Sequence, residues 1–373
     1  MSDKVRAVVL TKSKELEIRE FEKPKLGSDD ILLKVILCGI CGSDIHFWKG
    51  TLGMSEVFIL GHEFIGEIAE AGDKALKERV LSIGDLVAVE ILMPCYHCNW
   101  CREGKYRLCG NDDTSQTGGY GRQFGCNIPL TREPTPLWGG FSQYLFVPRE
   151  AIIHKYKKGV NVKAAVMTEP FSTAMHTIER ADPLIGESCA ILGPGTIGLC
   201  LTIAAKLKGL YPIILIGSGE KDNHRLELGK KLGADYIINL SDESKDPITL
   251  IRDVVQDTGV NISIDASGVS TAQILGIKIL KRGGRTVLVG ISNKRSINII
   301  PDIDLVFKEA TIFGSILNKG YGKAVKLIEN KQVPVEKLVT HEFALDDIGE
   351  AFKFVKERKE NVIKAVINPW KSK

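Results

Sequence analysis

Residues 188–198 have the sequence SCAILGPGTIG, in which a short apolar strand runs directly into a glycine-rich turn. The pattern G-x-G-x-x-G is common, but here it follows a predicted strand and begins a helical run that reaches Lys208. The glycines permit a tight turn and a close approach of the backbone to a ligand, while the helix N-terminus faces a pyrophosphate. We therefore predict a dinucleotide-binding turn formed by Gly193, Pro194, Gly195, Thr196, Ile197 and Gly198.

Strands and helices alternate after this turn. Apolar strands are expected at residues 213–216, 236–238, 262–265 and 286–289, and helices at residues 225–232, 248–256 and 271–280. Apolar strands that alternate with helices are typical of a parallel sheet covered on both faces. This part of the chain is therefore expected to be a doubly wound α/β domain. Two further helices are expected near residues 323–330 and 348–356.

The first third of the chain has a different pattern. Residues 6–10, 31–37 and 64–69 are short β-branched stretches broken by glycine and proline, which indicates a β-rich domain. Glycine and proline then become frequent between residues 94 and 140, so this stretch is expected to be mostly loop and to be held by something other than a core. No residue of the segment 111–138 can be assigned a role from the sequence.

The composition excludes several classes of protein. The length of 373 residues suggests two domains, and 44% hydrophobic with 26% charged residues is ordinary for a globular protein. The net charge of +4 argues against nucleic acid or an anionic membrane as a partner. No apolar run approaches the ~20 residues of a membrane span, and residues 1–6 contain no signal-like apolar region. A cytoplasmic protein is expected.

Four of the nine cysteines lie within fifteen residues. An odd number of cysteines without a signal peptide argues against a secreted disulfide framework. Thiolates at this spacing can surround one Zn²⁺ and make a closed structural site, although the spacing alone also permits an iron–sulfur cluster. The lack of a proline after the last cysteine favours zinc. The predicted ligands are Cys95, Cys98, Cys101 and Cys109.

A second candidate metal site is dispersed over residues 39–46, 61–66 and 168–170. Each segment is a weak signal alone. Together they offer the thiolate of Cys41, the imidazole of His62 and the carboxylates of Glu63 and Glu169. Three protein ligands with one open position are what a catalytic zinc requires.

These signals, in this order, resemble the zinc-dependent medium-chain dehydrogenase/reductase family, which includes alcohol, sorbitol and threonine dehydrogenases. The matching motifs are GICGSDIH at 39–46, GHE at 61–63, GDLV at 84–87, the four-cysteine lobe, GGFSQY at 139–144 and the nucleotide turn. The resemblance implies a GroES-like catalytic domain at 1–167 with 308–373 and a Rossmann coenzyme domain at 168–307. It also implies hydride transfer between an alcohol, polyol or sugar and NAD(P), two zinc ions per subunit, and a homodimer or homotetramer.

The resemblance also implies roles for single residues. Cys41, His62 and Glu169 are implied as ligands of the catalytic zinc, with Glu63 as an alternate ligand. Ser43 is implied to bond the substrate oxygen, and His46 to end the proton relay. Glu169 stands where classical alcohol dehydrogenases have a second cysteine, which is similar to the polyol and threonine dehydrogenase branches.

The coenzyme preference follows from the end of the second strand. An acidic residue that binds the ribose of NAD is expected about 20 residues after the glycine turn, but Gly217 stands there. We therefore predict that NADP is preferred, and NAD is the alternative if Glu220 or Asp222 reaches the ribose. The expected coenzyme contacts outside the turn are Gly217, Ser218, Lys221, Arg225 and Gly268.

Three alternatives remain at this point. A zinc-ribbon protein that binds nucleic acid would explain the four cysteines but not the nucleotide turn, and a zinc hydrolase would have no use for that turn. A zinc-free quinone reductase of the same superfamily would leave Cys41 and His62 unexplained. His97 is expected to be a solvated loop residue, His176 a packed core residue, and Cys126 stays unassigned.

Overall fold

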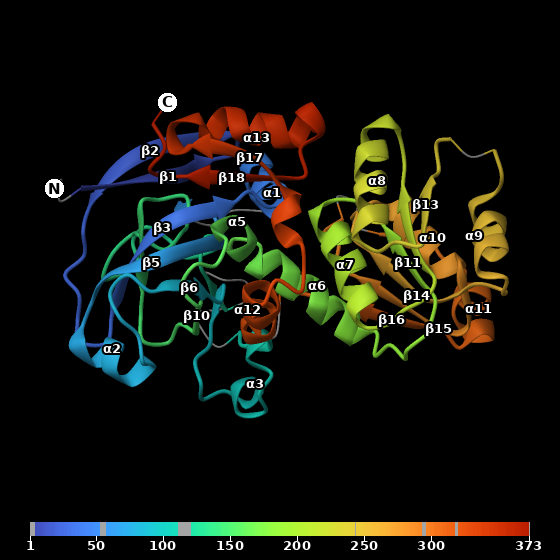
Figure 1. Ribbon diagram of the computed structural model, residues 1–373, viewed down its shortest axis with the longest axis horizontal. Coiled ribbons are helices and arrows are strands. Elements are labelled where there is room, and N and C mark those ends of the chain that lie inside the picture. Colours follow the sequence, from blue (N-terminus) through green and yellow to red (C-terminus); the bar gives the residue numbers. More distant parts are fainter. Residues whose placement is uncertain are drawn as a thin grey trace. The chain divides into compact units, whose positions relative to one another are not determined.

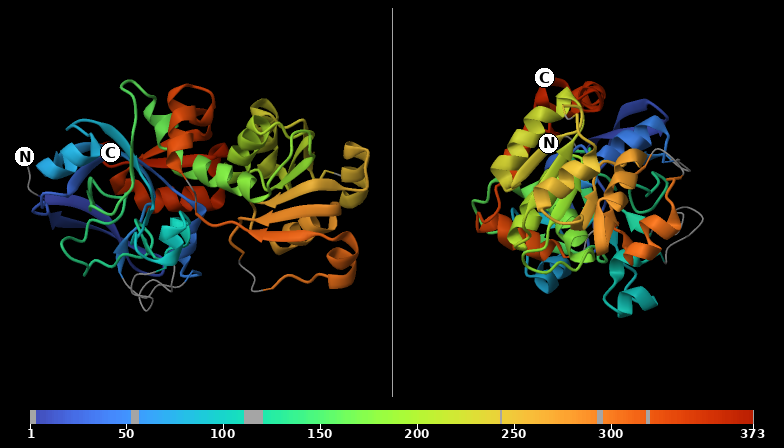
Figure 2. Two further views of the ribbon diagram at one scale, coloured as in Figure 1. Left: turned by 90° about the horizontal axis from the view of Figure 1, so that it is seen from below. Right: turned by 90° about the vertical axis from the view of Figure 1, so that its right-hand side faces the viewer.

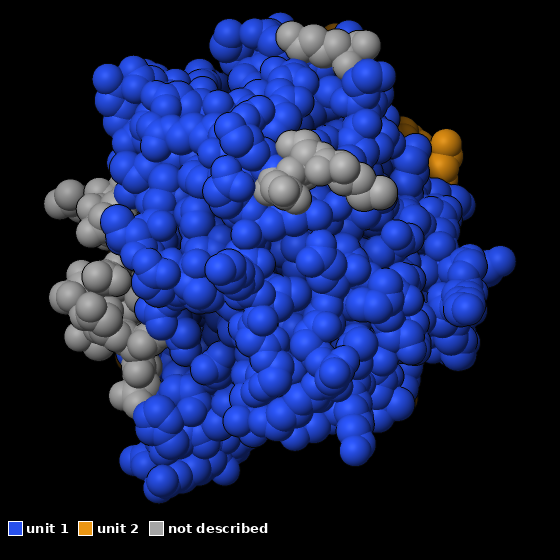
Figure 3. All heavy atoms as spheres, turned by 90° about the vertical axis from the view of Figure 1, so that its left-hand side faces the viewer, with its two compact units in different colours: residues 1–169, 320–373 blue, residues 170–319 orange. Residues whose placement is uncertain are grey.

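The computed structural model describes residues 4–52, 57–110, 121–242, 244–292, 296–317 and 320–372. The chain divides into two compact units, which Figure 3 colours separately. Unit 1 comprises residues 1–169 and 320–373, and unit 2 comprises residues 170–319. Among the described residues, no helix is both long enough and apolar enough to cross a membrane.

Unit 1 is built mainly from β-strands. Its strands are β1 (Lys4–Lys12), β2 (Glu15–Glu22), β3 (Ile31–Gly39), β4 (Phe58–Ile59), β5 (Glu63–Ala71), β6 (Leu86–Val89), β7 (Leu92–Met93), β8 (Arg122–Gln123), β9 (Tyr144–Val147), β10 (Ile153–Lys155), β17 (Val339–Ala344) and β18 (Lys364–Asn368). Its helices are α1 (Gly42–Lys49), α2 (Asp73–Arg79), α3 (Asn99–Arg102), α5 (Val162–Ala165), α12 (Tyr321–Glu329) and α13 (Ile348–Glu357). The strands expected at 6–10, 31–37 and 64–69 all form.

The central sheet of unit 1 joins the two ends of the chain. Its strand order is β10-β6-β5-β3-β18-β17, and β9 also pairs with β3. The C-terminal strand β18 lies antiparallel to β3, with Val366 opposite Gly39, so the red and blue ends of the ribbon lie side by side in Figure 1. Fully buried side chains of β1, β3 and β5 form its core together with α13. This pairing brings residues 39, 63 and 364 to one place.

Unit 2 is a doubly wound parallel sheet. Its strands are β11 (Cys189–Leu192), β12 (Ile213–Gly217), β13 (Tyr236–Asn239), β14 (Val260–Asp265), β15 (Leu280–Leu288) and β16 (Thr311–Gly314). Its helices are α7 (Thr196–Leu207), α8 (Asn223–Leu232), α9 (Pro247–Val255), α10 (Ser270–Lys278) and α11 (Pro301–Asp304), and α6 (Thr168–Arg180) spans the boundary between the units. Helices cover both faces of the sheet (Figures 1 and 2). The expected fold class is confirmed.

The strand order in unit 2 is β13-β12-β11-β14-β15-β16. In an open parallel sheet of this order, ligands bind where the order reverses, which here is between β11 and β14. Strand β16 pairs in parallel with β15, so residues 311–314 lie in the sheet of unit 2. The sequence had placed them, as part of 308–373, with the catalytic domain. A single short strand at a domain boundary carries no signal that shows which sheet it joins.

Candidate functional site

The first group of candidate ligands lies where α1 begins and where β5 begins. Cys41 precedes the first turn of α1, and its backbone N–H donates to Asp44 Oδ2 at 2.8 Å. His62 and Glu63 come from the antiparallel neighbour of β3, where Glu63 stands opposite Gly39. One ligand atom each of Cys41, His62 and Glu63 lie within 4.8 Å of one another.

Burial shapes the chemistry of this group. The side chains of His62 and Asp44 are 6% and 0% exposed, and His62 Nδ1 lies 3.4 Å from Asp44 Oδ1. The carboxylate of Asp44 therefore orients the ring and leaves Nε2 as the nitrogen for a metal. Burial lowers the pKa of His62, but the neighbouring Cys126, Asp44 and Cys41 raise it well above its ordinary value. Zinc must displace that proton to bind.

Glu63 is held by a cation from the far end of the chain. Lys364, the first residue of β18, donates to Glu63 Oε2 and to the carbonyl of Ile40, the latter at 3.0 Å. Both side chains are almost fully buried, at 3% for Lys364 and 1% for Glu63. The sequence analysis missed Lys364. Nothing in a single sequence distinguishes one lysine at the start of an apolar strand from a solvated one.

The donor set fits a zinc ion. Sulfur, imidazole nitrogen and carboxylate oxygen are the zinc ligands of proteins. One buried carboxylate oxygen in the group, Glu63 Oε1, has no hydrogen-bond partner among the described residues, whereas Asp44 Oδ1 and His62 Nδ1 face each other at 3.4 Å. Unsatisfied buried groups of this kind are rare and call for an explanation, and a bound cation would satisfy the carboxylate oxygen.

Glu169 lies outside this three-residue group. It is in the first turn of α6, it is 9% exposed, and it is near enough to Lys364 to affect the pKa of that lysine.

Ser43 and His46 lie three residues apart on α1, on one face of the helix. His46 Nδ1 is 3.0 Å from Thr51 Oγ1, which leaves Nε2 for proton transfer. Partial burial and Lys49 lower the pKa of His46.

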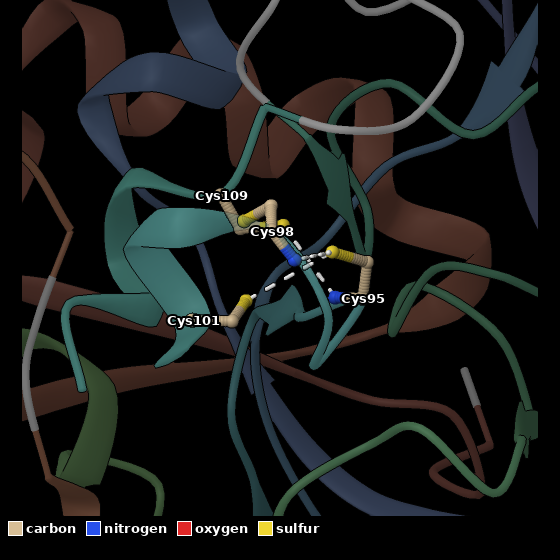
Figure 4. A group of neighbouring side chains, drawn as sticks. All are labelled: Cys95, Cys98, Cys101 and Cys109. Carbon is tan, nitrogen blue, oxygen red and sulfur yellow. Dashed lines mark hydrogen bonds between the residues drawn. The ribbon is translucent and has the colours of Figure 1, made fainter. Parts of the chain in front are cut away.

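The four-cysteine group forms a compact lobe (Figure 4). The sulfurs of Cys95, Cys98, Cys101 and Cys109 all lie within 4.8 Å of one another, and Cys95 Sγ is 4.0 Å from Cys101 Sγ. A tetrahedral ion with bonds of ~2.3 Å separates its sulfurs by roughly 3.8 Å, so this cage fits a single zinc. A four-iron cluster needs a wider cage, because each cysteine then binds a different iron. His97 is exposed, as expected, and its Nδ1 lies 2.7 Å from the carbonyl oxygen of Cys95.

Backbone donors already point at two of these sulfurs. The N–H of Cys98 donates to Cys95 Sγ, and the N–H of Cys95 donates to Cys109 Sγ, both at 3.4 Å. Burial and the neighbouring Cys98 raise the pKa of Cys101 to about 12. The thiol of Cys101 is therefore protonated without a metal at neutral pH, and metal binding releases the proton.

The nucleotide turn has the geometry that its glycines predict. Gly193 has φ +102°, and a Cβ there would lie 2.9 Å from the Cβ of Ser267. A Cβ on Gly198 would lie 1.9 Å from the carbonyl oxygen of Gly193. The guanidinium of Arg225 lies 4.0 Å from the Cβ position of Gly195, which places a buried cation beside the turn. Helix α7 follows directly and directs its N-terminus at the same turn.

Asp265 holds the facing turn at the end of β14. Its buried carboxylate accepts hydrogen bonds from the Ser267 N–H at 2.9 Å, from the Gly268 N–H at 3.3 Å and from Gln273 Nε2 at 3.0 Å. Gly268 has φ +66°, and a Cβ there would lie 2.2 Å from the carbonyl oxygen of Ile291. The structure thus gives Asp265 a positioning role at this turn.

The end of β12 carries no acidic side chain. Gly217 is buried, and Ser218 and Lys221 are exposed. The nearby Asp222 is 5% exposed, and its Oδ2 accepts from the Ser218 N–H at 3.0 Å. The carboxylate of Asp222, which packs against Gly217, is therefore already bonded to the backbone of the loop.

His176 of α6 is 5% exposed, which confirms it as a packed residue.

Comparisons with known proteins agree with this geometry. Residues 27–158 match the family described as "Alcohol dehydrogenase GroES-like domain", and residues 196–330 match "Zinc-binding dehydrogenase". Sorbitol dehydrogenase of Bacillus subtilis is 30% identical over 98% of this chain and 97% of its own. L-threonine 3-dehydrogenase of Thermococcus kodakarensis is 30% identical over the whole of both chains.

Solved structures agree with this result. An alcohol dehydrogenase from Thermotoga maritima superposes with a TM-score of 0.86 at 25% identity, covering 98% of this chain and 99% of its own. L-idonate 5-dehydrogenase from Escherichia coli superposes with a TM-score of 0.82 at 25% identity, covering 98% of each chain. The chain therefore belongs to the zinc-dependent medium-chain dehydrogenase/reductase family.

Proposed function

We propose that this protein is a zinc-dependent oxidoreductase that transfers a hydride between an alcohol and NAD(P). The observation that carries the proposal is the buried group of Cys41, His62 and Glu63, whose sulfur, nitrogen and oxygen atoms lie within 4.8 Å of one another. In this proposal unit 1 is the catalytic domain and unit 2 is the coenzyme domain. Family membership supports this function over a zinc-ribbon nucleic-acid-binding protein and over a zinc-free quinone reductase.

The catalytic zinc would be held by Cys41, by His62 and by a carboxylate from Glu63 or Glu169. A zinc ion at this place supplies Lewis acidity to a substrate oxygen. Asp44 keeps the His62 ring in position for the metal. A second zinc would occupy the four-cysteine lobe, where it stabilises the lobe and performs no chemistry.

Proton transfer is assigned to α1. Ser43 would hydrogen-bond the substrate oxygen and pass its proton toward His46, which would release it to solvent. The lowered pKa of His46 keeps its imidazole neutral near pH 7, and a neutral imidazole can accept a proton. Thr51 fixes the ring through Nδ1, so the accepting atom would be Nε2.

The coenzyme would bind on unit 2 at residues 193–198, with Gly268 admitting the nicotinamide ribose. The 2′-phosphate would lie near the end of β12, with Ser218, Lys221 and Arg225 as its candidate contacts. Asp222 is already bonded to the loop backbone, which supports NADP as the preferred coenzyme. Position 217 is a glycine, so the acidic side chain that would repel a 2′-phosphate there is absent.

The substrate would be a polyol, a sugar or another secondary alcohol. The relatives support this class, since they include sorbitol, erythritol/L-threitol and L-threonine dehydrogenases. We further propose a cytoplasmic homodimer or homotetramer. Exposed apolar side chains beside the edge strand β16 support self-association, namely Ile303, Val306, Phe307, Ile312 and Ile316.

A substrate panel tests this function. Purified protein is assayed with alcohols, polyols and sugars, each with NAD and with NADP, by the absorbance of reduced nicotinamide. Activity should appear with at least one secondary alcohol and should disappear after chelation and return with zinc. A metal-replete protein that binds neither coenzyme would contradict the proposal, and a tenfold preference for NAD would contradict the NADP assignment.

A further inference from the structure

The loop that follows β12 is held by a side chain from the neighbouring strand β13. The last residue pair between these strands is Gly217 and Asn239, and Asn239 is the last residue of β13. Beyond this pair the side chain of Asn239 takes over from the backbone. Its Oδ1 accepts from the Gly219 N–H at 2.9 Å, and its Nδ2 donates to the Gly219 carbonyl at 3.1 Å. One amide therefore binds both backbone groups of a single loop residue.

The same amide also reaches the helix that follows the loop. Nδ2 donates at 2.5 Å to Oδ1 of Asn223, the first residue of α8, and Oδ1 also accepts from the Ser241 N–H at 3.2 Å. Two donors and two accepted bonds use the full capacity of an amide and fix its orientation. Only 9% of Asn239 is exposed. Asn239 therefore ties the middle of the loop to the start of α8.

The conformation of Gly219 explains why the loop needs this support. Gly219 has φ +98° and ψ 160°, a backbone region that is essentially restricted to glycine. Glycine also loses more conformational freedom on ordering than any other residue. A backbone of this kind keeps one shape only where its surroundings determine it, and such places are frequent at ligand-binding sites. Here the surroundings that determine it are the two hydrogen bonds from Asn239.

This loop lies where a doubly wound sheet contacts the ribose of a dinucleotide. In that fold, residues after the second strand distinguish the 2′-OH of NAD from the 2′-phosphate of NADP. The second strand of unit 2 is β12, which ends at Gly217. Ser218 precedes Gly219 and Lys221 follows it, and the side chains of both are exposed. The positions of these two candidate phosphate contacts therefore depend on the conformation of Gly219.

We propose that Asn239 is a positioning residue that sets the preference for NADP over NAD. The inference rests on the proposed function, which places the coenzyme on unit 2. Asn239 holds Gly219 so that Ser218 and Lys221 are in place before the 2′-phosphate arrives. Preorganisation raises affinity, because the loop has less freedom left to lose on binding. The turn at 193–198, which would hold the pyrophosphate common to both coenzymes, follows β11 instead.

Binding of the two reduced coenzymes tests the inference without measuring turnover. NADPH and NADH are titrated into the full-length protein, and their dissociation constants are obtained from nicotinamide fluorescence. Asn239→Ala should weaken NADPH binding about tenfold and NADH binding less than about twofold, because only NADPH carries the phosphate that the loop is held to receive. A merely structural role would weaken both equally. An unchanged ratio of the two dissociation constants would overturn the inference.

Asn261→Ala is the matched control. Asn261 lies near the start of β14, at the opposite end of the same sheet. Its Oδ1 accepts from the Ser188 N–H at 3.2 Å and from Ser188 Oγ at 2.9 Å, so it is also an amide that holds a neighbouring segment. This variant should lower the thermal stability and keep the ratio. A shift of the ratio as large as that in Asn239→Ala would overturn the inference, because general loosening of unit 2 would then be the cause.

Gly219→Ala alters the loop without changing Asn239. A Cβ at position 219 meets no described atom within 4 Å, but alanine strongly disfavours this backbone conformation. The variant should reproduce the selective loss of NADPH affinity. In the double variant with Asn239→Ala the two losses should not add, because both act through the same loop shape. Additive losses would indicate independent effects and would overturn the inference.

Gly219→Ala also decides the matter if Asn239→Ala does not fold. A selective loss of NADPH affinity then supports the inference, and an unchanged ratio overturns it. Failure of the proposed function is read from the wild type instead. A wild-type protein that binds neither coenzyme refutes that function, and one that binds NADH more tightly refutes its NADP assignment, so the failures are distinguishable.

Discussion

Replacing Lys364 by methionine should strongly destabilise unit 1 of the zinc-free protein. Methionine keeps most of the volume but removes the cation that pairs with Glu63, whose side chain is 1% exposed. Breaking a buried ion pair from one side costs about 3–5 kcal/mol, because it leaves an uncompensated buried charge. The same change also removes the hydrogen bond to the carbonyl of Ile40.

The tryptophans make the measurement specific. All four, Trp48, Trp100, Trp138 and Trp370, belong to unit 1, so their fluorescence during urea unfolding reports on this unit alone. Lys353→Met is the control, because Lys353 pairs with Glu350 at 2.9 Å on the surface of α13, where both side chains are more than half exposed. The control should change the free energy of unfolding by less than about 1 kcal/mol.

A double-mutant cycle separates the ion pair from simple packing. Adding Glu63→Gln to Lys364→Met should recover about 2–3 kcal/mol, because the stranded charge is gone. Zinc should also reduce the loss in Lys364→Met, because a bound cation compensates the same carboxylate. If Lys364→Met lowers the free energy of unfolding by no more than Lys353→Met does, the pair of Lys364 and Glu63 does not stabilise the buried charge of the site.

The pair should keep its full effect across the neutral range. Burial opposes the charge on Lys364, but the carboxylate of Glu63 and the nearby Cys41 raise the pKa of Lys364 above its ordinary value. A group whose pKa is raised in the folded state contributes its full stabilisation below its unfolded pKa, which is about 10.4 for lysine. The stabilisation is lost only as the pH rises above that value. The free-energy difference between wild type and the double variant Glu63→Gln/Lys364→Met, which leaves no stranded charge, should therefore be the same at pH 6.5 and pH 8.5.

Three further predictions concern the proton relay, the lobe and the coenzyme. Because Lys49 helps to lower the pKa of His46, Lys49→Gln should move the acidic limb of the pH profile of kcat/KM to higher pH, and an unmoved limb would exclude His46 as the titrating group. Cys101→Ser should reduce the zinc content from two ions to one per chain while coenzyme binding to unit 2 persists, as metal analysis and coenzyme titration will show. Lys221→Met should lower kcat/KM for NADP about tenfold and leave that for NAD within about twofold, because a single phosphate contact is removed; equal losses for both coenzymes would contradict its placement.

The fold of unit 2 was predictable because its signals are local. The strand at 189–192, the turn and the following helix are contiguous, and each later strand repeats the same alternation. The predicted helix at 225–232 forms from Asn223 to Leu232 and ends at Gly233 as glycine favours. The strand expected at 286–289 extends instead from Leu280 to Leu288, because pairing with β14 and β16 determines its length.

The site in unit 1 was predictable only in part. Motifs marked Cys41 and His62, and the structure brings them together with Glu63. The part played by Lys364 depends on the pairing of β18 with β3, more than 300 residues apart in the sequence, and no local pattern predicts that pairing. The close approach of Gly125 to Gly61, the residue before His62, could not be inferred either, because it is a property of the packed loops.

The register of one sheet determines the metal-binding group. Glu63 stands opposite Gly39, and Gly39 in turn stands opposite Val366, two residues after Lys364. Side chains alternate between the faces of a sheet, so a shift of one residue in either pairing would turn Glu63 or Lys364 away from its partner. A Cβ at position 39 would lie 2.2 Å from Glu63 Oε2, so the carboxylate can reach its lysine only over a glycine. Glycine is therefore needed at position 39, where the motif GICGSDIH begins, because a side chain there would displace the pair of Glu63 and Lys364 beside the candidate metal ligands.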